Sequence, residues 1–254
     1  MNIPRTFLAV PAAGFAALLM MSAPAMAAES GSAQADLQPI PLNDAPGTGS
    51  AMVEIDGSTL SFTLTAQGLL ADAPHAAHIH FGADARHECP TAEDDADGGG
   101  TINTTDGAPA YGPIVVSLTT EGDTSPDSGL AVDRFGVGDD INYSRGDVEV
   151  SPEVATAVLA GQAAVVVHGV DHDGSGAYDG DTMSDLDPAL PTEATDPAIC
   201  GVLNASQMDM PAGGVQTGEA AVGGSDLGLI VAGGAAVLAG GALLVARRRT
   251  STDS

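Results

Sequence analysis

The most constraining feature of this sequence is the clean alternation of apolar and polar residues in TLSFTLTA, residues 59–66. Leu60, Phe62 and Leu64 fall at every second position, which places them together on one face of a half-buried β-strand. Further short runs have a similar alternating or β-branched character, at residues 51–55, 77–81, 114–119, 130–135, 163–168 and 200–203. Gly, Asp and Pro separate these runs, so we predict an all-β Greek-key β-sandwich or flattened barrel.

The rest of the central region has little regular pattern. Only residues 152–161, PEVATAVLAG, predict a helical turn. Residues 91–111 and 169–199 predict long loops, which in compact domains are usually functional or disordered. We assign residues 47–206 to the β domain and residues 28–46, which are polar with scattered Pro, to a flexible leader.

The N-terminal end is typical of an export signal. Arg5 precedes an apolar run over residues 7–21, and Ala25-Met26-Ala27 supplies the small residues that signal peptidase requires. The run is shorter than the ~20 residues of a membrane span. Residues 1–27 therefore predict a cleaved signal peptide.

The C-terminal end predicts a membrane anchor. Residues 227–246 carry no charge and are followed by Arg247, Arg248 and Arg249. The positive-inside rule places residues 247–254 in the cytoplasm as a tail, with the β domain outside and residues 207–226 as a Gly/Ala-rich stalk. This arrangement also resembles a cell-wall sorting signal, with Thr217 as the attachment residue, so the localisation is the cell membrane or the cell wall.

Charge excludes one class of partner. The chain has 7 Lys plus Arg against 34 Asp plus Glu, for a net charge of −27. Nucleic-acid binding depends on Lys and Arg side chains that neutralise phosphates, so we expect no nucleic-acid partner. The sequence indicates the membrane as a partner, with the cell wall as the alternative, and identifies no other partner.

The two cysteines are Cys89 and Cys200. After export they would lie in an oxidising compartment, where a disulfide is the expected state. We predict that they form one bond.

The histidines are clustered rather than scattered. His78 and His80 are two residues apart, so on a strand both imidazoles point to one face. His168 ends the apolar strand AAVVVH, and pairing of the two strands would bring in a third nitrogen. Three neutral imidazoles suit copper or zinc, and copper is favoured by the order of affinities.

These residues resemble two known families. HAAHIHFG, Cys89, VVVHG and AICGVL follow the order of the copper-zinc superoxide dismutase signatures, and HIH followed by YGPIVVSLTT is similar to the CHRD (chordin-type) domain. The layout is similar to that of surface proteins of actinobacteria. The dismutase resemblance implies that His78, His80 and His168 bind copper, that His75 is structural, and that Cys89 and Cys200 are bonded.

The sequence departs from the dismutases where catalysis would need it. Residues 90–113, which correspond to the zinc loop, contain no His, so zinc is not expected. Pro197 stands at the position of the guiding Arg. Residues 169–199 contain eight acids and no base, which would repel the superoxide anion.

The same acidic loop offers a calcium hypothesis. Asp171 and Asp173 alternate in DHDGSG, and Asp179 and Asp181 could complete the ligand set. The bidentate Glu at position twelve of an EF-hand loop is replaced by Thr182.

Three functions follow from these patterns. The first is a surface-anchored binding or structural module that could bind copper, with no catalytic residues. The alternatives are an extracytoplasmic copper-only superoxide dismutase and a calcium-dependent adhesive module.

Overall fold

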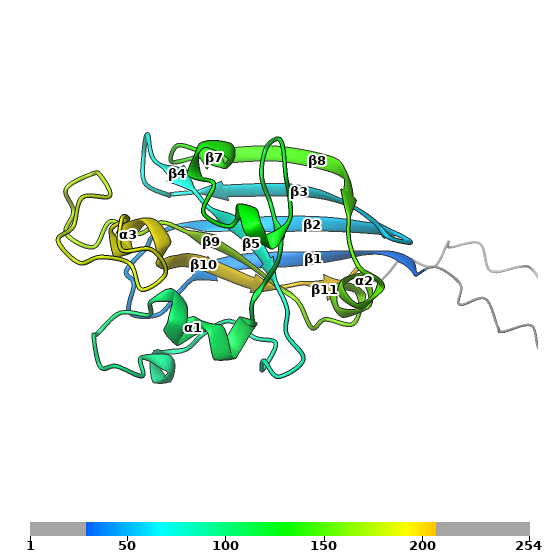
Figure 1. Ribbon diagram of the computed structural model, residues 1–254, viewed down its shortest axis with the longest axis horizontal. Helices are drawn as coiled ribbons and strands as arrows, with labels where there is room; N and C mark the ends of the chain where they lie inside the picture. The colour runs from blue at the N-terminus through cyan, green and yellow to red at the C-terminus, as the bar shows by residue number, and fades with distance from the viewer. Residues whose placement is uncertain (1–28, 207–254) are drawn as a thin grey trace, which may run out of the picture. The chain divides into compact units, whose positions relative to one another are not determined.

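The computed structural model describes residues 29–206, and strands dominate this region (Figure 1). The elements in chain order are β1 (Ser30–Pro39), β2 (Thr48–Asp56), β3 (Thr59–Gln67), β4 (Pro74–His75), β5 (Ala77–His80), η1 (Ala92–Asp94), α1 (Thr104–Tyr111), β6 (Ile114–Ser117), η2 (Pro126–Ser128), η3 (Val132–Arg134), β7 (Gly136–Val137), β8 (Ile141–Glu149), α2 (Pro152–Leu159), β9 (Ala164–His168), α3 (Thr192–Thr195), β10 (Pro197–Val202) and β11 (Asn204–Ala205).

The predicted signal peptide, stalk, membrane span and cytoplasmic tail lie outside the described residues. Within residues 29–206, no helix is both long and apolar enough to cross a membrane.

The main sheet is antiparallel, with the strand order β6-β5-β9-β10-β1-β2-β3-β8 and with β11 paired to β1. β6 and β8 are the two edge strands, so the chain crosses from one edge of the sheet to the other after β6. Side chains of β8 connect these edges: the Tyr143 hydroxyl donates to the Leu118 carbonyl at 2.7 Å, and Nη1 of Arg145 donates to Oγ1 of Thr119 at 2.7 Å. The all-β prediction is confirmed, in the form of one curled, half-barrel sheet.

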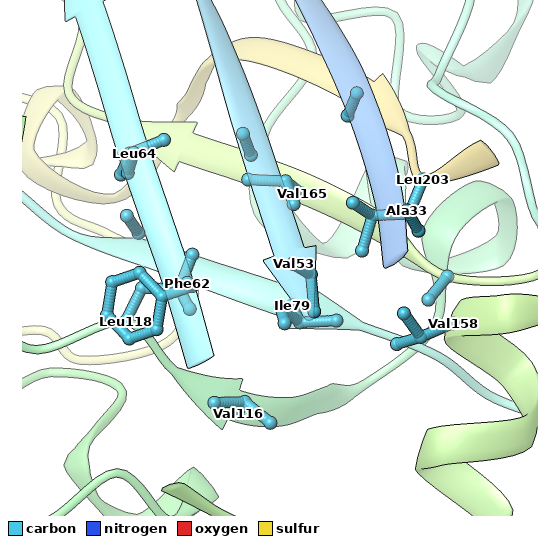
Figure 2. Packing of buried hydrophobic residues seen from close by; sticks show 14 of the residues in the cluster. Ala33, Val53, Phe62, Leu64, Ile79, Val116, Leu118, Val158, Val165 and Leu203 are labelled. Carbon is cyan, nitrogen blue, oxygen red and sulfur yellow. The ribbon is translucent and has the colours of Figure 1, made fainter. Parts of the chain in front are cut away.

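The main core lies inside the curl. Leu60, Phe62 and Leu64 are buried on the inner face of β3, as their alternation predicts. Figure 2 shows Phe62 and Leu64 in a cluster with residues of the other half of the sheet, among them Val165 of β9 and Ile79 of β5. Burial of this shared apolar surface holds the two halves of the sheet together.

The flexible leader predicted for residues 28–46 is wrong. Residues 30–39 form β1, which pairs with β2 on one side and β10 on the other, in the middle of the sheet. Ala33, Ala35 and Leu37 are buried at alternate positions. Alternation of small Ala with polar residues gives a weak sequence signal, yet it fits a crowded interior position. The β domain therefore begins before residue 47.

A second correction concerns residues 130–135, which were predicted as a strand. They form turns around η3, and Leu130 is 39% exposed. The long strand in this region is β8, which the sequence did not indicate because most of its residues are polar. It is an edge strand, and its pairing to β3 has a register shift between Leu60 and Phe62. Asp147 near this irregularity has φ 57°.

The helices show ordinary capping. The prediction for residues 152–161 is confirmed by α2, where the Ser151 side chain accepts from the Val154 N–H and Pro152 starts the first turn. Helix α1 lies in the predicted loop 91–111, and the reciprocal bonds of Asn103 and Asp106 cap it. Figure 1 shows α3 at one end of the sheet and α2 at the other.

The predicted disulfide between Cys89 and Cys200 is confirmed. It ties the segment before α1 to β10, and Cys200 packs with Ile102, Tyr111 and Val166 in a second core cluster. The long segment that carries α1 is thereby fixed to the outer side of the sheet, close to the histidines described next.

Candidate metal centre

His78 and His80 reach the outer side of the sheet because β5 alternates. Ile79 between them belongs to the main core, so its two neighbours point the opposite way. Strand β9 is antiparallel to β5, with Ala77 opposite Val167, and His168 follows as the last residue of β9. A backbone bond from the His168 N–H to the Ala76 carbonyl, 2.7 Å long, fixes this end of the strand.

The three imidazoles converge, as the sequence predicted. One nitrogen from each of His78, His80 and His168, the histidine triad, lies within 4.8 Å of the other two. All three residues are buried, with exposed fractions of 2%, 2% and 3%. Nδ1 of His78, Nε2 of His80 and Nε2 of His168 have no hydrogen-bond partner. Three nitrogens this close together can share one metal ion, because metal–nitrogen bonds are about 2 Å long.

The second nitrogen of each ring is held by a backbone carbonyl. Nε2 of His78 lies 3.0 Å from the Gly129 oxygen, Nδ1 of His80 lies 2.8 Å from the Gly112 oxygen, and Nδ1 of His168 lies 2.6 Å from the Thr195 oxygen. A carbonyl only accepts hydrogen bonds, so each of these nitrogens carries the proton and donates. In a neutral ring the remaining nitrogen then has a free lone pair, which is the tautomer that a metal ligand needs.

Burial also keeps the rings neutral. It lowers the pKa of His78 well below its ordinary value, that of His80 to about 3 and that of His168 to about 4. The charge that a protonated His168 would carry further lowers the pKa of His78 and His80. Near neutral pH the triad is therefore uncharged and ready to donate three lone pairs.

A cavity of about 540 Å³ opens in front of the triad. Its lining comes from α1, β6, the η2–η3 segment and the loop before α3. Apolar side chains predominate, and within the described part of the chain Asp127 is the one charged residue that lines it. Tyr111 also lines the cavity, and burial raises the pKa of its phenol, which keeps it uncharged.

This lining differs from what the acidic loop led us to expect. Residues 169–199 contribute Leu186, Leu190, Ala194 and Thr195 to the cavity, and none of their eight acids. Four of these acids accept backbone N–H groups of the loop itself, namely Asp171, Asp173, Asp187 and Glu193. The cavity therefore lacks a wall of carboxylates, and it equally lacks a base.

The calcium hypothesis stays a prediction, with a changed set of residues. Asp171 and Asp173 have carboxylate oxygens within 4.8 Å of each other and of Glu193, and neither Asp179 nor Asp181 belongs to this group. Asp171 accepts the N–H groups of Gly174, Ser175 and Gly176, so the loop itself already uses its carboxylate.

The other histidines lie apart from the triad. His75 is fully buried, with Nε2 3.0 Å from the Leu70 oxygen and Nδ1 3.0 Å from the His168 oxygen, which suits the structural role that the dismutase resemblance implies. Nε2 of His172 lies 2.9 Å from Oδ2 of Asp196, and Nε2 of His87 lies 2.9 Å from the Gly82 oxygen. Neither of these belongs to the three-histidine group.

Sequence reasoning missed what surrounds the triad. The carbonyls of Gly112, Gly129 and Thr195 lie at the ends of three separate helices, α1, η2 and α3. Every residue has a backbone carbonyl, so no residue type marks these positions in the sequence. Leu186 and Leu190 stand in a stretch whose acids dominated its interpretation. Their spacing in SDLDPALP gave a faint apolar signal, but only the tertiary structure brings them to the histidines.

The comparison with family models agrees with the CHRD resemblance of the sequence. A family model described as the CHRD domain matches residues 27–177, which is more than half of the chain and includes β1 through β9 with the whole triad. No curated protein matches the sequence. Superoxide dismutase 5 of Candida albicans in its Cu(II) form is similar at 13% identity and a TM-score of 0.39, covering 73% of this chain and 99% of that chain. A point mutant of the same Candida albicans enzyme gives 14% identity and a TM-score of 0.39, covering 75% and 98%.

Proposed function

The chain belongs to the CHRD domain family, and from that premise we propose that its β domain is a copper-binding module displayed outside the cytoplasm. The histidine triad would hold the ion. We further propose that the module binds copper without efficient catalysis, as a binding or structural unit of the cell surface.

The observation that supports copper binding is the set of three unpartnered nitrogens in one buried place. A buried polar atom without a partner costs about 1–3 kcal/mol, and three together form an unusual concentration of that cost. A bound metal ion removes it, since each lone pair then has an acceptor. If the histidines were only structural, each free lone pair would be expected to accept a hydrogen bond from a nearby donor.

The donor set favours copper among the divalent metals. Three neutral imidazoles without thiolate or carboxylate suit copper or zinc, and copper binds nitrogen ligands more tightly. The carbonyls of Gly112, Gly129 and Thr195 would orient the rings and raise their basicity, as outer-shell partners of metal-bound histidines do. Bound copper would supply one-electron redox chemistry beside the cavity.

Export is supported by the disulfide. A bond between Cys89 and Cys200 is stable in an oxidising compartment and rare in the cytosol. With the predicted signal over residues 1–27 and the predicted span over residues 227–246, it supports a protein held at the cell membrane with its β domain outside. Attachment to the cell wall through Thr217 is the alternative.

A copper-only superoxide dismutase is the second candidate, favoured by the cavity that leads from the surface to the triad. Against efficient turnover stands the lining, in which the described residues include no Lys or Arg. An anion entering this cavity meets apolar walls and the field of a chain with net charge −27.

Copper titration of the metal-free protein tests the proposal. We expect one tightly bound copper per chain and an electron paramagnetic resonance spectrum with nitrogen hyperfine structure. His168→Gln should abolish both, while His87→Gln, which removes a histidine outside the triad, should leave them unchanged. A melting curve of each metal-free variant separates loss of a ligand from loss of the fold.

The outcomes divide the two candidates. No copper uptake by a folded protein would refute both, and superoxide consumption close to the diffusion limit would refute the non-catalytic proposal. Copper uptake with slow or no superoxide consumption is the expected result.

A further inference from the structure

The cavity beside the triad has aliphatic side chains on several sides. Ile114 comes from β6, Leu130 from the turn after η2, and Leu186 and Leu190 from the loop before α3. Leu130 and Leu186 are 39% and 46% exposed, and they line the same cavity as Ile114 and Leu190 instead of standing singly on the surface. A cavity of about 540 Å³ is within the usual range for sites that bind small molecules.

Most polar groups around the cavity are already engaged. The Tyr111 hydroxyl donates to the Thr104 carbonyl at 3.2 Å, and Oγ1 of Thr104 donates to the Thr195 carbonyl at 2.7 Å. Among the described residues, the buried side-chain nitrogens and oxygens without a hydrogen-bond partner are the three nitrogens of the triad, whose residues line the cavity. The cavity thus combines apolar walls with one cluster of polar atoms, which is typical of pockets that bind small molecules.

The charges around the cavity select against ions. Asp127, on the exposed surface, is the one charged side chain that lines it within residues 29–206. An anion finds no base there. A cation would have to give up its hydration to apolar walls for a single carboxylate that stays in water.

We propose that this cavity binds a neutral, largely apolar small molecule, which points one lone-pair donor at the metal held by the triad. This inference rests on the proposed copper site and adds the class of ligand that the site accepts. The walls formed by Ile114, Leu130, Leu186 and Leu190 provide the affinity, and the metal orients the donor atom.

Two neutral copper ligands that differ by one aromatic ring test the inference. Imidazole and 4-phenylimidazole are titrated into the copper-loaded full chain in micelles, and binding is measured from the shift in the copper spectrum. Because burying a phenyl ring removes apolar surface from water, we expect 4-phenylimidazole to bind about ten- to a hundredfold more tightly. An analogue with a carboxylate on the ring should lose most of this gain.

Variants at the exposed leucines locate the effect. Leu186→Asp and Leu130→Asp should each reduce the ratio of the two affinities toward one while imidazole itself binds as before. Met52→Asp is the matched control, because Met52 is 47% exposed on β2 and does not line the cavity. For each variant only the ratio of the two ligand affinities is compared with the ratio in the other variants. Differences in copper content and the partition of the ligands into micelles therefore do not affect the comparison.

The outcomes separate this inference from the proposed function. Equal affinities in a chain that takes up one copper would overturn the inference and leave the copper site standing. A preference for 4-phenylimidazole that Leu186→Asp and Met52→Asp change equally would also overturn it. Failure to take up copper at all would overturn the proposed function first, and this inference with it.

Discussion

Acidification of the metal-free protein should destabilise it steeply, well before its carboxylates titrate. His78, His80 and His168 are buried as neutral rings, and burial lowers the pKa of His80 to about 3 and that of His168 to about 4. In the unfolded chain each ring has the ordinary pKa of about 6.5. Between these values the unfolded state binds more protons than the folded state, so stability falls as the pH falls.

The magnitude follows from the number of rings. One proton taken up only by the unfolded state changes the free energy of unfolding by about 1.4 kcal/mol per pH unit. From pH 7 to pH 5 each ring then contributes a loss of about 2 kcal/mol, and the three of the triad about 6 kcal/mol. A domain of this size has about 5–15 kcal/mol in total, so the metal-free protein should be close to unfolding at pH 5.

Two other histidines change the expected loss of stability between pH 7 and pH 5, in opposite directions. Burial also lowers the pKa of His75, which adds to the loss. A hydrogen bond to Asp196 raises the pKa of His172, so its contribution to stability is present below pH 6.5 and is lost as the pH rises through its folded value. Below pH 6.5 His172 is protonated in both states, and it adds no slope to the acid side.

Urea unfolding at several pH values between 7 and 5, with a chelator present, measures the effect. We expect the free energy of unfolding to fall by about 4 kcal/mol per pH unit near pH 5.5, which corresponds to three protons. Copper-loaded protein should resist the same acidification until the metal is released, because protons then compete with the ion for the rings. His87→Gln serves as the control and should keep the slope.

A flat profile between pH 7 and pH 5 would refute the reasoning. It would mean that the three rings take up protons in the folded state as readily as in the unfolded one. Such rings would be neither buried nor held as neutral donors to Gly112, Gly129 and Thr195, and the argument for a preformed metal site would lose its basis.

Three further predictions concern the frame around the site. Cys89→Ser together with Cys200→Ser should lower the free energy of unfolding by about 4–5 kcal/mol, because the bond closes a chain segment with a separation of 111 residues; urea unfolding with and without a reductant checks this. Asn43→Ala should cost about 3 kcal/mol or more in a thermal melt, since its buried side chain bonds both backbone groups of Ile102 and the Pro197 carbonyl. Tyr143→Phe should cost about 1 kcal/mol in urea unfolding by removing the bond between the edge strands, with copper stoichiometry unchanged.

The parts of the fold that the sequence predicted are those with strong local signals. The alternation of β3 and the capped start of α2 were enough to identify both elements. The sequence did not indicate β1, because that strand buries mainly Ala, nor β8, because that strand is a polar edge strand with an irregular pairing. In both strands the deciding factor is the neighbouring strand rather than the local residue pattern.

The site divides in the same way. The spacing of His78 and His80 and the position of His168 at a strand end predicted the convergence that the structure shows. What makes these rings suitable for a metal is the protonation of their second nitrogens, and this depends on carbonyls far away in sequence. No single-sequence pattern encodes that choice of tautomer.

The acidic loop shows that the effect of charged residues depends on where the fold puts their side chains. The buried carboxylate of Glu193 accepts the N–H groups of His172, Asp179 and Gly180, and so holds the loop against the domain. The same loop presents Leu186 and Leu190 to the cavity. The acids thus shape the segment, while its leucines face the triad. An anion is disfavoured at the site because bases are missing from the lining and the walls are apolar, and the same two properties favour a neutral ligand.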